Sequence, residues 1–190
     1  MYTCVVVKDR VLWIDGVHMH RGDEPPEKTA SRMASLLHLN RDAVVLDTCT
    51  GLGYAALALS EKAAKVTTVE KSKQVLDLVA LHNPAVFEKK NIEVIHNDVC
   101  EMILQLPDKS FDAVLHDPPR FSMAGELYSG VFYKELHRVL KNGGKLFHYT
   151  GKPGANSGKN LLKGIKQRLQ DAGFKKIEWQ EEALGFSSIA

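Results

Sequence analysis

Acidic side chains in this sequence stand where runs of apolar and β-branched residues end. Four such runs close on an acid: Asp47, Glu70, Asp98 and Asp117. Stretches with helical spacing lie between the runs, and this alternation is typical of a parallel sheet. The carboxyl ends of parallel strands meet at one edge, where ligands bind. We therefore expect the four carboxylates to share one cleft, where they can accept hydrogen bonds from hydroxyl and amine groups or attract a cation.

A short loop with two glycines follows Asp47 and leads into a helical run that starts near Ala55. Gly51 and Gly53 allow the backbone to approach a ligand closely, as in loops that hold nucleotides. The carboxylate of Glu70, 23 residues after Asp47, is placed to accept from both hydroxyls of a ribose. The pattern predicts a cofactor that contains a nucleoside.

Two such cofactors fit the glycine pattern, and Asp47 separates them. A dinucleotide would bring an anionic pyrophosphate to the loop, where Asp47 would repel it. S-adenosylmethionine has no phosphate and carries an ammonium and a sulfonium, so an acid suits it. Asp98 can accept from the adenine amine. The predicted cofactor contacts are Asp47, Thr48, Gly51, Gly53, Glu70, Asp98, Val99 and His116.

The run Asp117-Pro118-Pro119 is the predicted acceptor site. Proline has no N–H, so the carbonyl oxygens and the Asp117 carboxylate remain available to accept from an exocyclic amine and orient its lone pair. Phe121 can stack on a flat base. His148 closes the next predicted strand, beside Tyr149, which is expected to line the pocket. The predicted catalytic residues are Asp117, Pro118, Pro119, Phe121 and His148.

His18 and His20 alternate on one face if residues 17–21 are extended, and both are candidates for substrate contact. With His116 and His148 they could form a metal site or a proton relay. Single histidines are more often structural, so we expect no metal.

These motifs resemble those of class I S-adenosylmethionine-dependent methyltransferases from residue 47 to the C-terminus. The runs 16–21, 47–54, 116–122 and 148–151 are similar to a group of predicted archaeal methyltransferases with no settled substrate. The resemblance implies an enzyme with an α/β fold: a Rossmann-like, doubly wound, seven-stranded, mostly parallel sheet, here with an N-terminal β-hairpin and helix. It also implies S-adenosylmethionine as the cofactor.

Two positions depart from the family pattern. Cys49 stands where the usual loop of the family has glycine. A loop with cysteine at this position looks more like the loops of RNA-modifying members. Arg120 stands where amine-methylating members have an aromatic residue, with Phe121 one position later. Asp-Pro-Pro-Arg also resembles the RNA uridine C5-methylating enzymes, which need a cysteine nucleophile. No cysteine follows Cys100, so direct methyl transfer is favoured. Cys49 is expected to lie near the N-terminus of a helix, a position that lowers the pKa of a thiol. We nevertheless interpret Cys49 as a packing residue under the cofactor.

Length and composition indicate one soluble domain. The 190 residues are 44% hydrophobic and 25% charged, typical of a globular chain. We expect a single methyltransferase domain over 1–190, with a hairpin and helix in 1–43 and the catalytic core in 44–190. No apolar run approaches ~18 residues, no leader pattern opens the sequence, and the three scattered cysteines suggest no disulfide frame. These features favour a cytoplasmic protein without membrane contact.

The expected elements follow from periodicity. A hairpin is predicted over 3–7 and 10–14 with its turn at 8–9, and a helix over 27–38. The predicted strands are 44–47, 65–70, 92–98, 111–117, 144–150, 175–182 and 185–190. The predicted helices are 53–63, 72–82, 100–106, 125–140 and 158–172. The run 141–144 is predicted to stop the fourth of these helices.

Net charge is only +2, but residues 152–176 hold seven basic side chains and one acid, Asp171. A basic patch can attract a phosphate backbone, although a solvated helix face has the same composition. We expect a methyltransferase that acts on an RNA base, in tRNA or rRNA. The alternatives are a small-molecule methyltransferase, an aminopropyl transferase of the same fold, and a non-catalytic RNA-binding relative. An aminopropyl transferase needs an acid-lined groove for a polyamine. The basic C-terminal third of the chain argues against such a groove. The oligomeric state is left open.

Overall fold

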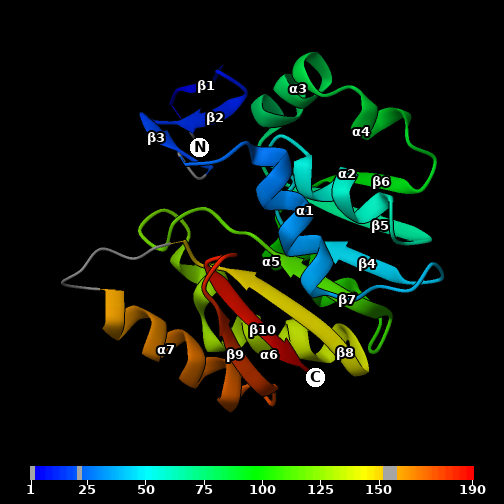
Figure 1. Ribbon diagram of the computed structural model, residues 1–190, viewed down its shortest axis with the longest axis vertical. Coiled ribbons are helices and arrows are strands. Elements are labelled where there is room, and N and C mark those ends of the chain that lie inside the picture. Colours follow the sequence, from blue (N-terminus) through cyan, green and yellow to red (C-terminus); the bar gives the residue numbers. More distant parts are fainter. Residues whose placement is uncertain (1–2, 21–22, 152–157) are drawn as a thin grey trace.

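The computed structural model describes residues 3–20, 23–151 and 158–190, and its centre is a seven-stranded sheet (Figure 1). In chain order the strands are β4 (Val44–Asp47), β5 (Lys65–Glu70), β6 (Ile92–His96), β7 (Phe111–His116), β8 (Leu140–Tyr149), β9 (Lys175–Gln180) and β10 (Gly185–Ile189). Their spatial order is β6-β5-β4-β7-β8-β10-β9, with β10 antiparallel to both neighbours and the other pairs parallel. The predicted mostly parallel, doubly wound sheet is confirmed.

Helices cover both faces because side chains alternate along each strand. On β4, Val45 packs against α1 (Pro26–Leu36) and α2 (Tyr54–Ser60), while its neighbour Leu46 joins the core on the opposite face. That second face is covered by α5 (Val99–Met102), α6 (Gly130–Val139) and α7 (Gly158–Asp171). Helices α3 (Lys73–His82) and α4 (Ala85–Glu88) lie beside the β5–β6 edge (Figure 1).

A small antiparallel sheet precedes α1 and forms the predicted hairpin with a third strand added. It consists of β1 (Val5–Lys8), β2 (Val11–Ile14) and β3 (Val17–His18). Its first turn uses Asp9 and Arg10, both with positive φ, one residue later than predicted. Leu12 and Ile14 are 2% and 3% exposed because they pack with Leu52 of the glycine loop. The small sheet is therefore fixed against the cofactor side of the core.

Local chemistry shifted several predicted boundaries. The helix predicted over 125–140 is divided into a 3₁₀ turn (η2, Gly125–Tyr128) and α6, because the Ser129 hydroxyl caps α6 by accepting from Phe132 N at 3.1 Å. The helix predicted over 100–106 becomes α5 followed by a second 3₁₀ turn (η1, Ile103–Gln105).

The predicted stop signal 141–144 does end the helix, but it lies inside β8, which starts at Leu140. There, Gly143 has a φ of 77° at an irregularity in the pairing with β7. The short helix α4 was not predicted. In the described part of the chain, no helix has the length and apolar character needed to cross a membrane.

Candidate active site

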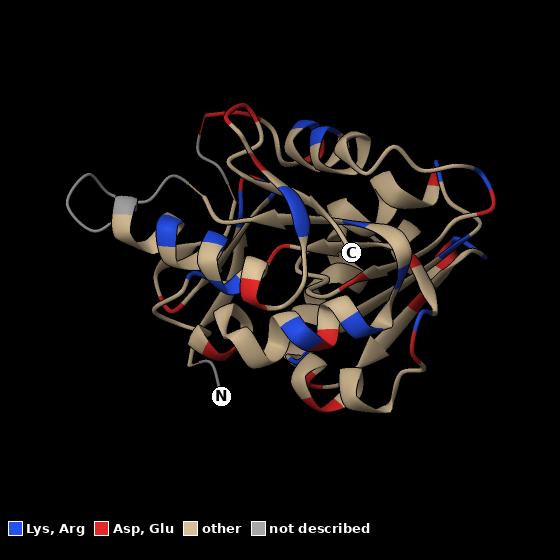
Figure 2. Ribbon diagram, turned by 90° about the horizontal axis from the view of Figure 1, so that it is seen from below, with Lys and Arg blue, Asp and Glu red and all other residues tan. Residues whose placement is uncertain are grey.

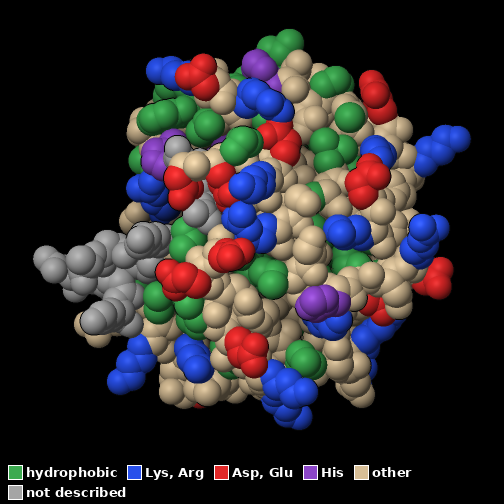
Figure 3. Space-filling model, viewed as in Figure 1, with side chains coloured by type: hydrophobic (Ala, Val, Ile, Leu, Met, Phe, Trp, Pro, Cys, Tyr) green, Lys and Arg blue, Asp and Glu red, His purple; other side chains and the backbone are tan. Residues whose placement is uncertain are grey.

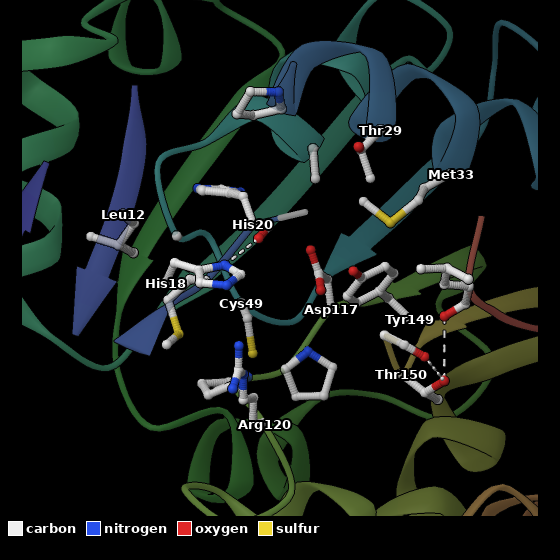
Figure 4. A pocket seen from close by; sticks show the side chains of 18 of the residues that line it. Leu12, His18, His20, Thr29, Met33, Cys49, Asp117, Arg120, Tyr149 and Thr150 are labelled. Carbon is white, nitrogen blue, oxygen red and sulfur yellow. Dashed lines mark hydrogen bonds between the residues drawn. The ribbon is translucent and has the colours of Figure 1, made fainter. Parts of the chain in front are cut away.

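A cavity of about 770 Å³ lies between the small N-terminal sheet, α1 and the carboxyl ends of β4, β5, β7 and β8 (Figure 4). This volume is in the range of sites that hold a small molecule. One side is formed by the glycine loop and Glu70, and the other by the Asp117-Pro118-Pro119 run. The cavity therefore brings the predicted cofactor and acceptor sites together.

Glu70 and Gly51 line the side of the cavity that is predicted to bind the cofactor. Glu70 is 9% exposed and lines the cavity, and its carboxylate accepts from the backbone N–H groups of Gly51 at 3.1 Å and Ser72 at 2.9 Å. Burial raises its pKa, while these bonds oppose the rise. Gly51 has a φ of 51° and nothing within 4 Å of the position a Cβ would occupy. A ligand can thus approach the backbone beside a fixed carboxylate that has lone pairs to spare.

Asp47 is fully buried and does not itself line the cavity. Its Oδ2 accepts from the Thr68 hydroxyl at 2.7 Å, while no described residue bonds to Oδ1. Burial, together with the nearby charges of Asp117 and Glu70, raises the pKa of Asp47 to about 8. A cation in the cavity would relieve this repulsion. The residues present therefore fit the ammonium and sulfonium of S-adenosylmethionine. Because Asp47 does not line the cavity, it would act through its charge and not through direct contact.

Gly53 and Thr48 have structural positions. Gly53 is the N-cap residue of α2 and has a φ of 79°, and a Cβ there would come within 2.4 Å of the Val86 side chain. A glycine is therefore required at position 53, where the loop packs on α4. The Thr48 hydroxyl points to the opposite face of the sheet and lies 2.7 Å from His116 Nδ1. Neither residue lines the cavity, so direct cofactor contact is not supported for them.

Asp98 and Val99 lie just after β6, beside the end of β5. One Asp98 oxygen caps α5 by accepting from Cys100 N at 2.9 Å, and the other pairs with Lys71 at 2.6 Å. These bonds hold the pKa of Asp98 below its usual value against the effect of burial. Val99 is 5% exposed. Both residues lie outside the cavity lining, so their contact with the cofactor stays a prediction.

The predicted acceptor side contains Asp117, Pro118, Pro119 and Phe121, all of which line the cavity. Burial raises the pKa of Asp117 to about 7. The Tyr128 hydroxyl donates to the Pro119 carbonyl at 3.0 Å, so this carbonyl, predicted to be available, is already engaged. Phe121 is 47% exposed and meets Tyr128 edge to face at 5.4 Å. An exposed aromatic face beside a carboxylate is suited to a flat, amine-bearing acceptor.

His116 and His148 are fully buried on the α6 side of the sheet, away from the cavity. His116 Nε2 donates to the Leu127 carbonyl at 3.0 Å, so its Nδ1 accepts from Thr48. His148 Nε2 lies 2.8 Å from the Tyr133 hydroxyl. Burial lowers the pKa of both rings. The predicted cofactor contact of His116 and catalytic role of His148 are corrected to structural roles, because residues 116 and 148 alternate with cavity-facing neighbours.

Some residues that line the cavity were only candidates in the sequence analysis, and others were not predicted at all. The candidates His18, His20 and Tyr149 do line the cavity. Thr29 and Met33 of α1 were missed, because the apolar face of α1 resembles a purely core-facing stripe. Figure 4 shows both side chains directed toward the same space as Asp117.

Cys49 also lines the cavity, but burial and the charge of Glu70 raise the pKa of its thiol well above the usual value. The nearby helix N-terminus therefore does not activate the thiol. Burial likewise raises the pKa of Cys100 to about 11. A thiol is a poor nucleophile, so neither cysteine is suited to covalent catalysis.

The charge of the cavity lining was not expected. Four acids line it: Asp23, Glu70, Asp117 and Glu181. Among the described lining residues, Arg120 is the single Lys or Arg. The groove is therefore acid-lined although the C-terminal third of the chain is basic, and the argument against an aminopropyl transferase from that third is wrong.

Residues 45–144 match the family model described as "Methyltransferase domain". The chain belongs to this methyltransferase domain family. A relative of 45% identity is an uncharacterized protein of Methanocaldococcus jannaschii, where the match covers 99% of this chain and 66% of that protein. The ribosomal RNA large subunit methyltransferase I of Photobacterium profundum is 27% identical and covers 72% of this chain. This chain spans 37% of that enzyme, so it corresponds to only part of either relative.

Solved structures share the fold. A spermidine synthase in complex with the transition state analogue AdoDATO superposes with a TM-score of 0.77 at 15% identity, over 95% of this chain and 65% of that one. A tRNA methyltransferase from Aquifex aeolicus gives a TM-score of 0.62 at 24% identity, over 84% of this chain and 57% of that one. The family match and this fold identify a methyltransferase domain of the S-adenosylmethionine-dependent type, in agreement with the predicted enzyme class and cofactor.

Proposed function

We propose that this protein methylates a nitrogen of an RNA base, with S-adenosylmethionine as the methyl donor. One observation carries the proposal: the Asp117-Pro118-Pro119 run faces the Glu70–Gly51 side across a single cavity. When bound, the cofactor supplies an electrophilic methyl group on a sulfonium. The protein then has to position an amine, and positioning accounts for much of the rate of such a step.

The cavity residues suit a base more than a phosphate. The Asp117 carboxylate can accept from an amine N–H, and Phe121 offers an exposed ring for stacking. The four lining acids would repel a phosphate, so the backbone of an RNA would remain at the mouth, where the exposed Arg120 is available. A flipped base, neutral and rich in donors, satisfies these conditions.

The basic region 152–176 would hold the rest of the RNA. Lys152 lies outside the described residues, and the structure does not describe the side chain of residue 159. Within the described part, Lys163 and Lys166 are exposed on α7, whose basic turns are visible in Figure 2. On the face shown in Figure 3, acidic and basic side chains are interspersed. Lysines on α7, rather than a broad basic surface, therefore support the RNA proposal.

A second candidate is the transfer of a methyl or aminopropyl group to a small cationic amine. The acid-lined cavity favours it, since Asp23, Asp117 and Glu181 can attract a protonated amine. The fold shared with spermidine synthase is compatible with this candidate.

Isothermal titration calorimetry tests the cofactor, with S-adenosylmethionine binding expected and NADH binding absent. The acceptor is then tested with [methyl-³H]-S-adenosylmethionine and either total tRNA and rRNA fragments or a panel of polyamines. We expect label in RNA. Label in polyamines alone would favour the methyl-transfer form of the second candidate. Aminopropyl transfer leaves the labelled methyl group on sulfur, so it is detected instead by the mass of the polyamine product after incubation with decarboxylated S-adenosylmethionine. No binding of S-adenosylmethionine would overturn methyl transfer to either acceptor.

The role of α7 is tested by the double variant Lys163→Glu and Lys166→Glu. We expect weaker RNA binding and a smaller salt dependence, because each neutralised phosphate releases counterions, with unchanged cofactor affinity. Lys62→Glu and Lys65→Glu, remote from α7, form the control. Equal RNA binding by both double variants and by the wild type at two salt concentrations would argue against an α7 interface.

A further inference from the structure

His18 lies on β3, on the wall of the cavity opposite the sheet. Its ring meets Trp13 edge to face at 5.5 Å, with an angle of 64° between the planes. Trp13 and His18 are also partners in the pairing of β2 with β3. The ring is therefore held by both backbone register and packing. Figure 4 shows His18 and Asp117 directed into the same cavity from opposite sides.

A backbone oxygen fixes the protonation pattern of the His18 ring. His18 Nδ1 lies 2.7 Å from the carbonyl oxygen of His20. A carbonyl oxygen can only accept a hydrogen bond, so Nδ1 must carry the hydrogen. In the neutral ring, Nε2 then holds the lone pair. Catalytic histidines are commonly oriented in this way, by an oxygen that binds the first nitrogen and leaves the second to act as a base.

We propose that Nε2 of His18 takes the proton that the acceptor nitrogen loses during methyl transfer. This inference rests on the proposed function. The nitrogen lone pair forms the new N–C bond to the methyl carbon, and the C–S bond breaks with its electron pair going to sulfur. The N–H proton passes to His18 Nε2 and then to solvent. No further reactant is needed.

The surrounding groups separate this role from that of Asp117. The cationic cofactor favours the ionised form of the Asp117 carboxylate, which then orients the amine as a hydrogen-bond acceptor. His20 stays neutral, since burial lowers its pKa to about 4, and it does not compete for the proton. Asp23 and Arg120 are the other charged groups along this part of the lining. Imidazole is the side chain that most often serves as a general base in enzymes.

The tautomer can be tested without knowledge of the acceptor. Long-range ¹H–¹⁵N correlation spectra of the histidine rings, recorded above pH 8 with S-adenosylhomocysteine present, distinguish Nδ1–H from Nε2–H rings. The His18 signals are assigned by their loss in His18→Phe. We expect the Nδ1–H form. An Nε2–H ring would overturn the inference while leaving the cofactor assignment intact.

The proton transfer is tested by steady-state kinetics, with the acceptor that becomes methylated in the labelling experiment as the substrate. His18→Phe keeps a flat ring against Trp13, and His18→Gln keeps a hydrogen-bond acceptor that cannot take the proton. We expect both to lower kcat by about 100-fold or more, in the range of general-base effects, with unchanged cofactor Kd. The exposed His82 on α3 gives the matched control, His82→Phe. Full activity of His18→Gln would reduce His18 to a positioning role and overturn the inference, as would full activity of His18→Phe.

Discussion

Neighbouring residues at the ends of β7 and β8 meet opposite environments on the two faces of the sheet. Asp117 and Tyr149 line the cavity, whereas His116 and His148, one position earlier, are fully buried against α6. On the α6 face, both nitrogens of His116 have partners within the protein. On the cavity face, burial and like charge hold carboxyl groups at a raised pKa.

This difference separates stability from function. A polar network whose bonds are all made inside the protein has nothing left to offer a ligand, and its effect is on folding. Groups that are destabilised in the free protein can gain from a ligand that supplies the missing charge or hydrogen bond. Variants on the two faces should therefore affect different measurements.

The largest effect is expected for Asp117→Asn on the cavity face. It removes the carboxylate that is proposed to orient the acceptor amine but keeps the shape of the side chain. We expect a loss of kcat of about 100-fold or more, the order seen when an oriented electrostatic contact is removed. Cofactor affinity and Tm should stay near those of the wild type. Equal loss of cofactor binding and turnover would show that Asp117 belongs to the cofactor side.

A smaller effect is expected for Glu70→Ala. The change removes the carboxylate predicted to bind the ribose, where a hydrogen bond to a charged group contributes about 1.5–3 kcal/mol. S-adenosylmethionine should bind at least about tenfold more weakly by calorimetry. Glu93→Ala on the adjacent strand β6 is the control, since Glu93 pairs with Lys65 outside the cavity. If the two variants bind alike, the ribose lies elsewhere.

A pH dependence should follow from Asp47. Its pKa of about 8 lies above the ordinary value, so the protonated form stabilises the fold at low pH and this contribution is lost as the pH rises through about 8. The ionised form attracts the cationic cofactor. Between pH 6 and 8.5 we expect affinity to rise about three- to tenfold, with proton release on binding, while the free protein loses stability.

Asp47→Asn should reduce both effects, since the amide does not titrate. The variant should bind the cofactor more weakly at pH 8.5 and should melt at a higher temperature than the wild type there. Calorimetry in buffers of different ionisation enthalpy measures the protons released. A wild-type affinity that falls with pH over this range would contradict the assignment of charge.

The smallest effect on catalysis is expected for Thr48→Val on the α6 face. Loss of the hydroxyl leaves His116 Nδ1 buried without a donor, which costs about 1–3 kcal/mol, or ~2–4 °C in Tm for each kcal/mol. Cofactor affinity and kcat of the folded protein should be unchanged. A large loss of cofactor binding at constant Tm would restore the predicted contact of Thr48 with the cofactor.

The sequence by itself determined the sheet, its order of elements and the cofactor loop. Alternating strand and helix patterns are local, and Gly51 and Glu70 follow their strands at fixed offsets, so their convergence follows from the parallel arrangement. The break before α6 depended on a single cap by Ser129. Periodicity alone does not show whether such a cap or a longer continuous helix is the more stable.

Only the tertiary structure decided which polar residues face the cavity. One step along a strand reverses the face, and residue type does not reveal which face holds the ligand; hence His116 and His148 were assigned to the site while Thr29 and Met33 were not. Two of the four acids in the lining, Asp23 and Glu181, are far apart in sequence. They meet only because the N-terminal segment and the β9–β10 connection pack around the same cavity. Long-range packing thus placed this part of the cavity wall, because no local pattern in the chain records which distant segment will cover a strand end.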